Sequence, residues 1–353
     1  MDLFDVLPQD HKFYNDRIKD FLPDRLFDAH THVFLKEKAD KLMPAAPART
    51  AGWPALVADR NPAEDLERTA ELMFPGKEYA PLMFGSVSDA SALDEINAYV
   101  ASCARKRGYP ALMVASPAMD AGALEDCVAA GGFKGIKVYL TFAPAYIPAD
   151  EIRIFDFLSR EHLEVCDSRG WTVMLHIARP ARLRDPVNLA QLLEIEGKYK
   201  SVKLIVAHVG RAYCDADADG AFEALKSAER MLFDISANTN TRIFERLIRA
   251  VGSSRILFGS DLPITRMRMR RVERGGTYVN LTPRGLYGDV SGDKNMGVLD
   301  PPESDGLTFF MYEEIEAFRQ AAICTGLKEG DIERVFWSNA ARLFDYKKQR
   351  AAP

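Results

Sequence analysis

Two histidines separated by one residue, His30 and His32, end the short apolar segment 27–33. Alternate side chains of a β-strand point to the same face, so the two imidazoles project together. Zinc, manganese and iron all accept neutral imidazole nitrogen, and two rings held at the end of a strand can chelate one divalent ion. Histidines also fall two apart by chance, so the meaning of the pair depends on where the other histidines lie.

Three further residues suited to metal binding or proton transfer also end apolar segments, and they are His176, His208 and Asp261. Four of the six histidines therefore follow apolar strand-like runs, whereas His162 is expected on the surface of a helix. A core histidine with satisfied hydrogen bonds is the ordinary explanation for any one of them. It does not explain four histidines and an aspartate in equivalent positions, and the pattern predicts a shared site.

Eight apolar segments alternate with helical segments and would position these side chains. Most are continuously apolar, which is typical of parallel strands buried on both faces by helices. The first strand lacks a glycine-rich nucleotide-binding turn, which favours a closed barrel over an open doubly wound sheet. We therefore predict an α/β fold, a (β/α)8 TIM barrel whose active site lies at the carboxyl ends of the strands. The predicted strands are 25–33, 81–86, 111–115, 133–140, 171–177, 203–209, 231–236 and 256–262.

The domain organisation follows from this pattern. We expect an N-terminal arm over residues 1–24, the barrel over 25–346 with extra C-terminal helices, and a tail over 347–353. The loops after the first and eighth strands, 34–80 and 264–310, are long enough to act as lids or inserts. Predicted helices include 61–74, 91–107, 121–130 and 150–170.

Composition excludes several classes of function. A formal charge of −5 over 353 residues gives no support to nucleic-acid binding, and no apolar run reaches membrane-spanning length. The N-terminus lacks the features of a signal peptide. Five scattered cysteines without CxxC spacing suggest reduced thiols and a cytoplasmic protein. The oligomeric state cannot be read from these features, and a homodimer is the commonest default.

The strand-end residues and the closing segment 335–344, VFWSNAARLF, resemble the amidohydrolase superfamily. The pattern is similar to the amidohydrolase-2 branch, which includes aminocarboxymuconate-semialdehyde decarboxylase and related lactonases and hydrolases. The resemblance implies His30, His32 and Asp261 as metal ligands, with His176 as the further ligand in one-metal members. It leaves His208 free to polarise the substrate or to move a proton.

Lys137 lies in the fourth predicted strand, where a lysine is costly unless it is paired. Two-metal members of the superfamily carry a carboxylated lysine that bridges both ions, and His176 and His208 would then take the second ion. Otherwise Lys137 pairs with Asp261 or holds an anionic substrate. We expect one divalent ion, Zn²⁺ first, with Mn²⁺ or Fe²⁺ as alternatives and two ions as the other arrangement.

Arginines gather in the loops that follow the strands, which suggests an anionic small-molecule substrate, because a guanidinium binds a carboxylate in a bidentate way. Arg179 and Arg211, nearest the histidines, are the best candidates, although any one arginine can instead pair with a protein acid or face solvent. Lys137 and Tyr139 are further candidates for substrate contact, and Trp53 for an apolar wall. The remaining arginines of these loops are Arg182, Arg184, Arg266, Arg268, Arg270 and Arg271.

These features predict a metal-dependent hydrolase of a small carboxylate-bearing amide, ester or lactone. Metal-activated water would attack, and Asp261 would shuttle its proton to the leaving group. The alternative is a metal-dependent non-oxidative decarboxylase on the same scaffold. A third possibility, metal binding without catalysis, is disfavoured because Asp261 and His208 are both retained.

Overall fold

Eight parallel strands form a closed barrel in the computed structural model, which describes residues 3–35, 52–86 and 92–347. β1 pairs with β2, and β3 to β8 form a six-stranded sheet in chain order. Parallel bridges from Met83 to Ala111 and from Thr31 to Leu262 join the two sheets and close the ring. The strands are β1 (Arg25–His32), β2 (Glu78–Phe84), β3 (Met113–Val114), β4 (Gly135–Val138), β5 (Thr172–Leu175), β6 (Lys203–Val206), β7 (Leu232–Asp234) and β8 (Ile256–Leu257).

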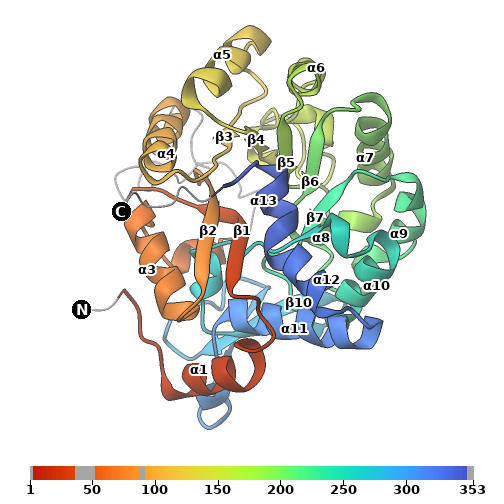
Figure 1. The fold of residues 1–353 in the computed structure, drawn as a ribbon. Coiled ribbons are helices and arrows are strands. Elements are labelled where there is room, and N and C mark those ends of the chain that lie inside the picture. The colour runs from red at the N-terminus through yellow and green to blue at the C-terminus, as the bar shows by residue number, and fades with distance from the viewer. Residues whose placement is uncertain (1–2, 36–51, 87–91, 348–353) are drawn as a thin grey trace.

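Helices surround the barrel (Figure 1). Their apolar faces pack on the outward side chains of the strands, while a second apolar cluster that includes Phe27, Leu82, Met174 and Leu257 fills the interior. The longer helices are α3 (Ala63–Met73), α4 (Leu93–Arg107), α5 (Ala121–Gly131), α6 (Arg160–Arg169), α7 (Pro186–Lys198), α10 (Thr241–Val251) and α11 (Phe310–Thr325), with the short α8 (His208–Arg211) and α9 (Ala221–Ala224) between β6 and β7.

Two predictions about the helix near residue 160 were wrong. The structure begins α6 at Arg160, because the Ser159 side chain caps it by accepting the backbone N–H of His162, and the residues before it form turns and a short 3-10 helix, Ile154–Asp156. His162 is not on the helix surface: it is buried, and its Nε2 lies 2.8 Å from the carbonyl oxygen of Met119. It is a core histidine with one ring nitrogen hydrogen-bonded, and its Nδ1 has no hydrogen-bond partner among the described residues.

The segment after β8 is a folded insert. It contains a three-stranded sheet in the order β11 (Met296–Leu299), β10 (Thr277–Pro283), β9 (Arg270–Arg274). The N-terminal arm, with α1 (Pro8–Phe13), supports this insert through Asp10, a buried carboxylate that accepts hydrogen bonds from Arg268 at 2.8 and 2.6 Å. Of the loop after β1, residues 36–51 lie outside the described residues, as does most of the predicted tail.

The helical run that ends the chain closes one end of the barrel, in front of the strands in Figure 1. It comprises α12 (Glu329–Glu333), a turn over Arg334–Ser338 and α13 (Asn339–Leu343). Trp337, Ala340 and Phe344 pack against Phe27 inside the barrel, so the functional end must be the opposite one. No helix in the described part of the chain is long and apolar enough to cross a bilayer.

Candidate active site

An irregularity in β1 turns the two histidines into the barrel. Phe27 and Ala29 belong to the interior cluster, so strict alternation would send His30 and His32 outward. The register with β2 shifts between Asp28 and Thr31, and this bulge restores the inward direction. His30 and His32 therefore share one face of β1, as predicted, and the bulge turns that face toward the interior of the barrel.

The Asp28 carboxylate, which is fully buried, stabilises the bulge. Its Oδ1 accepts the backbone N–H of His30 at 3.1 Å and of Ser260 at 2.8 Å, and its Oδ2 accepts the Tyr79 hydroxyl at 2.6 Å. Burial raises the pKa of Asp28 to about 7 despite these hydrogen bonds. Gly259 completes the fit, because a Cβ at this position would lie 2.8 Å from the Cβ of His30.

His30, His32 and Asp261 converge at the mouth of the barrel. The Nε2 atoms of His30 and His32 lie 3.4 and 3.0 Å from the same oxygen, Asp261 Oδ1. The opposite ring nitrogens have acceptors: His30 Nδ1 lies 3.0 Å from Asp234 Oδ2, and His32 Nδ1 lies 3.4 Å from the Gly85 carbonyl oxygen. With the proton on Nδ1, where each ring has its acceptor, each Nε2 presents a lone pair toward an ionised carboxylate; with the proton on Nε2, His32 instead donates to Asp261 Oδ1.

Lone pairs that face one another at these distances call for a cation between them. Two ligands about 2.1 Å from a shared ion lie roughly 3.0 to 3.4 Å apart. Metal-binding histidines commonly donate the other ring N–H to a carboxylate or a carbonyl, as His30 and His32 do. The donor set of His30, His32 and Asp261 thus fits a divalent metal ion.

The charge state of the centre suits the same ion. Burial, together with the nearby Lys137 charge, lowers the pKa of His30 to about 3, so its ring is neutral at pH 7. Burial alone would raise the pKa of Asp261, but the hydrogen bond with His32 and the neighbouring histidines lower it to about 2. Neutral imidazole and ionised carboxylate are the ligand forms that metal binding requires.

Asp234 links three of the site's elements and was missed by the sequence analysis. Its carboxylate accepts the His208 backbone N–H at 2.9 Å, the Ser236 hydroxyl and N–H, and the His30 ring N–H. Although burial opposes ionisation, these partners hold the pKa of Asp234 well below its usual range. Asp234 ends β7 as Asp261 follows β8, so the strand-end signal applied to Asp261 could have found it.

His208 belongs to the left-handed turn, His208–Arg211, whose φ angles are 56°, 50°, 62° and 59°. Residues other than glycine rarely adopt this conformation, and such strain clusters at functional sites. Even Gly210 has no room for a side chain, because a Cβ there would lie 2.6 Å from Leu183 Cδ1. The ring of His208 packs 4.7 Å from that of His30, between centroids.

The tautomer of His208 is set by Ser236. Nδ1 of His208 lies 3.1 Å from the Ser236 carbonyl oxygen and 2.9 Å from its hydroxyl oxygen. The hydroxyl donates its own proton to Asp234, so His208 Nδ1 must be the donor. Burial lowers the pKa of His208, which leaves a neutral ring with an unprotonated Nε2. His208 can accept a proton in this form.

His176 lies beside His208 rather than within the group just described. Among the described residues, the groups with donor atoms within 4.8 Å of one another are His30–His32–Asp261 and His30–His208–Asp234. The ring of His176 is 5.2 Å from that of His208, and its buried Nδ1 has no hydrogen-bond partner. Burial and the positive charge of Arg211 lower the pKa of His176 well below its usual range. A neutral ring with an unsatisfied nitrogen is available to a ligand.

Lys137 on β4 and Tyr139, which directly follows β4, both lie against the histidines of β1. Lys137 is fully buried, with Nζ 3.5 Å from His30 Nε2, and burial lowers its pKa to about 8 even though Asp234 and Asp261 oppose the shift. The Tyr139 hydroxyl donates to the Gly85 carbonyl at 3.4 Å and lies 3.5 Å from His32 Nδ1. Lys137 therefore faces the ligand side of the histidines, and Tyr139 faces the supporting side.

The two arginines predicted to bind substrate differ in their environments. Arg179 donates to Asp185 Oδ1 at 2.9 Å and to the Glu151 carbonyl at 3.2 Å, so a protein carboxylate matches its charge. Arg211 donates only to the Ile177 carbonyl, at 3.4 Å, and has no carboxylate within 4.0 Å in the described structure. Of the two, Arg211 keeps its charge available beside His176.

The family profile described as "Amidohydrolase" matches residues 27–346. The chain belongs to the amidohydrolase family. No curated protein matches this amidohydrolase. Its family and its barrel fold are those that the sequence predicted.

Several solved structures share the fold of this amidohydrolase. A probable 2-pyrone-4,6-dicarboxylic acid hydrolase from Acinetobacter baumannii is 15% identical, with a TM-score of 0.55 over 91% of this chain and 99% of that chain. An amidohydrolase from Burkholderia multivorans is 12% identical, with a TM-score of 0.58 over 91% and 99%. A 5-carboxyvanillate decarboxylase from Sphingomonas paucimobilis is 14% identical, with a TM-score of 0.54 over 92% and 100%.

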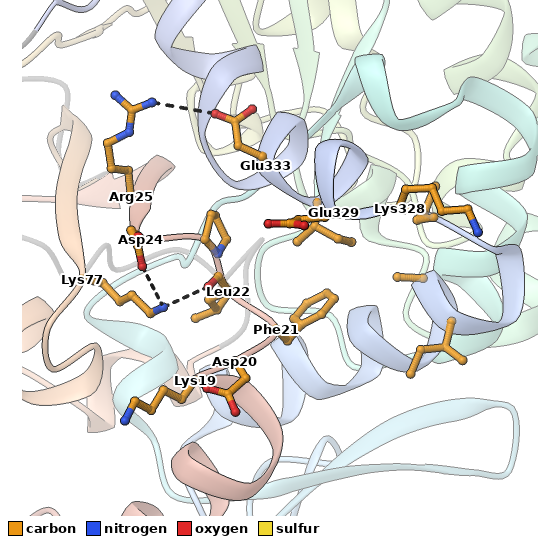
Figure 2. A pocket seen from close by; sticks show the side chains of 15 residues that line it. Lys19, Asp20, Phe21, Leu22, Asp24, Arg25, Lys77, Lys328, Glu329 and Glu333 are labelled. Carbon is orange, nitrogen blue, oxygen red and sulfur yellow. Dashed lines mark hydrogen bonds and ion pairs between the residues drawn. The ribbon is translucent and has the colours of Figure 1, made fainter.

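A surface hollow of about 870 Å³ lies away from this centre. It is lined by the N-terminal arm, the start of β1, the residue before β2, and the segment from the end of α11 through α12, including Lys19, Arg25, Lys77 and Glu333 (Figure 2). Because Arg25 begins β1 whereas the histidines end it, this hollow lies toward the end of the barrel that α13 closes. The site chemistry and the hollow are therefore separate.

Proposed function

We propose that this amidohydrolase is a metal-dependent hydrolase of a small carboxylate-bearing amide, ester or lactone. The observation that carries the proposal is the convergence of His30 Nε2 and His32 Nε2 on Asp261 Oδ1 while both Nδ1 atoms have acceptors elsewhere. Zn²⁺, Mn²⁺ or Fe²⁺ held there, with His176 as a further ligand, supplies Lewis acidity that lowers the pKa of water from ~16 to about 7.

One ion is favoured over two. The second group of potential ligands, His30, His208 and Asp234, shares His30 with the first. Its carboxylate already accepts the His30 Nδ1 proton, so Asp234 supports the first ion instead of holding another. Lys137, with a pKa of about 8, would need to be carboxylated to bridge two ions; a second equivalent of metal per chain would favour that arrangement.

The chain's own residues divide the proton transfers. Asp261 is ionised, so it takes the proton of the attacking water and returns it to the leaving group. His208 Nε2 is the alternative acceptor for that water proton, and the imidazolium that forms would polarise the substrate carbonyl and then return the proton to the leaving group. Arg211 binds a carboxylate of the substrate through its free N–H groups.

A decarboxylase is the second candidate, favoured by the similarity to 5-carboxyvanillate decarboxylase and to a 2,6-dihydroxybenzoate decarboxylase. The carbon–carbon bond to the carboxylate breaks, carbon dioxide leaves, and a protonated side chain gives a proton to the remaining carbon. Manganese was bound in the structure of a related dihydroxybenzoic acid decarboxylase from Polaromonas, so Mn²⁺ belongs among the metals tested.

One experiment tests the proposal and separates the two reactions. The purified protein is stripped with a chelator, reloaded with one metal at a time, and given lactones, amides, esters and carboxylated aromatics in ¹⁸O-labelled water. A hydrolase incorporates ¹⁸O into a product carboxylate only when metal is present, whereas a decarboxylase releases carbon dioxide without adding ¹⁸O to its other product. Metal-independent hydrolysis would overturn the proposal.

A further inference from the structure

Arg271 is a charged group that the proposed mechanism does not use. It lies on β9 directly opposite Asn280 on β10, and its Nε donates to Asn280 Oδ1 at 2.8 Å. Its Nη1 donates to the Ala237 carbonyl at 2.6 Å. Ala237 follows Ser236, which fixes the His208 ring, so the insert anchors this guanidinium on the segment that also supports the metal centre.

No protein carboxylate compensates this charge. Within the described residues, Arg271 has no acidic group within 4.0 Å, and burial lowers its pKa. A guanidinium has five N–H donors, and the two hydrogen bonds above leave three of them free. Arg268, three residues earlier, shows the contrasting case, because Asp10 accepts both of its terminal nitrogens.

Aromatic rings surround the guanidinium and limit the directions from which an anion can approach. The Cζ atom of Arg271 lies 4.3 to 5.9 Å from four ring centroids, those of Tyr278, Phe310, Tyr213 and Trp53. Rings attract a cation but do not neutralise it. The buried Nε1 of Trp53 is a second donor without a hydrogen-bond partner among the residues described. A buried unsatisfied donor beside a cation without a described acidic partner indicates an acceptor from outside the chain.

Tyr213 connects this cluster with Arg211. Burial raises the pKa of Tyr213 to about 12, although the charges of Arg211, Arg271 and Arg182 all oppose the shift. Three guanidinium groups therefore lie within electrostatic range of one phenol. In the part of the chain that the structure describes, Asp217 forms an ion pair with Arg182 alone, and Arg211 and Arg271 have no carboxylate within 4.0 Å.

We propose that Arg271 and Trp53 form a second anion subsite and that the substrate is a dicarboxylate, with one carboxylate at Arg211 and the other at Arg271. The inference rests on the proposed function, which it deepens by naming the substrate class. Arg271 is a specificity-determining residue that contacts the carboxylate remote from the reacting bond. The insert supplies this contact, and the barrel supplies the chemistry.

Binding to the metal-free protein tests the subsite without requiring turnover. Isothermal titration compares benzoate, with one carboxylate, with isophthalate and terephthalate, whose two carboxylates are spaced differently. The wild type is expected to bind at least one of the dicarboxylates about 10-fold or more tightly than benzoate. Arg271→Met should reduce this preference to less than 3-fold.

Arg270→Met is the matched control. Arg270 is the neighbouring residue on the opposite face of β9, it is 53% exposed, and its Nε lies 3.6 Å from Glu313. This variant should keep the wild-type preference. Trp53→Phe removes the N–H but keeps an aromatic ring, and it should lose a smaller part of the preference. Arg271→Lys keeps the positive charge but lacks the paired N–H donors of the guanidinium, so its preference for dicarboxylates should be intermediate. This variant keeps the test valid even if Arg271→Met does not fold.

Equal affinity of the wild type for mono- and dicarboxylates, or an unchanged preference in Arg271→Met or Arg271→Lys, overturns the subsite. A change of oligomeric state in Arg271→Met with the preference retained would assign Arg271 to a contact between chains and also overturn it. Failure of metal-dependent turnover with the Arg271-dependent preference intact would count against the proposed reaction alone.

Discussion

The metal centre and the insert treat charge in opposite ways. At the centre, the buried Asp234 carboxylate accepts four donors, and Asp261 lies where a bound cation would match its charge. On the insert, Arg271 is held in place by neutral acceptors and has no described carboxylate partner. A compensated site is pre-organised for an ion and a proton, which vary little between substrates. The positive charge of Arg271, which has no described acidic partner, can bind a specific anionic group. We infer that this contact on the insert determines which substrate is bound.

The largest effect is expected at Asp261, which tests whether the metal centre carries the chemistry. Asp261→Asn removes the carboxylate that takes the proton, so kcat should fall about 10³-fold while the fold is retained. Steady-state kinetics together with metal analysis of the same sample provide the measurement. Near-normal turnover with metal bound would eliminate the proton-transfer role.

Asp234 tests whether the supporting network, and not only the ligands, maintains the centre. Asp234→Asn removes the charge that orients His30, so the Kd for the metal should rise about 10- to 100-fold. Competition against a chelator of known affinity measures it. Asp126→Asn, on the exposed face of α5, is the matched control and should leave the affinity unchanged; an equal effect of both would remove Asp234 from the network.

Arg211 is close to His176 on one side and to Tyr213 of the Arg271 cluster on the other, so it tests how the metal centre and the insert share substrate binding. Arg211→Ala should raise KM for a carboxylate substrate about 10-fold with little change in kcat, because the contact is made in both ground and transition states. Arg211→Lys should recover part of the loss. An unchanged KM would show that the charge beside His176 does not contact substrate.

An effect on stability and not on activity is expected at Lys137, whose pKa is about 8 in the folded protein against an ordinary value of 10.5. Between these values the unfolded chain binds more protons, so stability rises with pH. Lys137→Met lacks this penalty, and its advantage over the metal-free wild type should shrink by about 1.4 kcal/mol per pH unit between pH 8 and 10. Urea unfolding in carbonate-free buffer measures the difference, and a difference constant with pH would contradict the shift.

Sequence periodicity was sufficient for the barrel and for the convergence of the strand-end residues. His30, His32 and Asp261 meet because parallel strands share one carboxyl edge, which is a property of topology and needs no side-chain detail. Asp234 ends a parallel strand in the same way, so the convergence of strand-end residues also predicts its place in the site. The bulge at Asp28 could not be predicted, because it depends on hydrogen bonds to Ser260 and Tyr79 from distant parts of the chain.

The state of each arginine was also beyond the sequence. Arg179 and Arg211 both follow histidine-bearing strands, and only three-dimensional structure shows that Asp185 pairs with the first. The three-stranded sheet of the insert was predicted only as a long loop, because its strands carry charged and polar residues and lack a sustained apolar pattern. Sequence reasoning found the residue types, while the pairing required coordinates.

The left-handed turn of residues 208–211 has a consequence for how this enzyme can change. One four-residue unit carries both a proton acceptor and an anion-binding cation, and its backbone conformation leaves no space for adjustment at Gly210. An insertion or deletion within it would disturb both groups at once. New specificities in this lineage would therefore arise more readily by exchange at the insert than by remodelling of the turn.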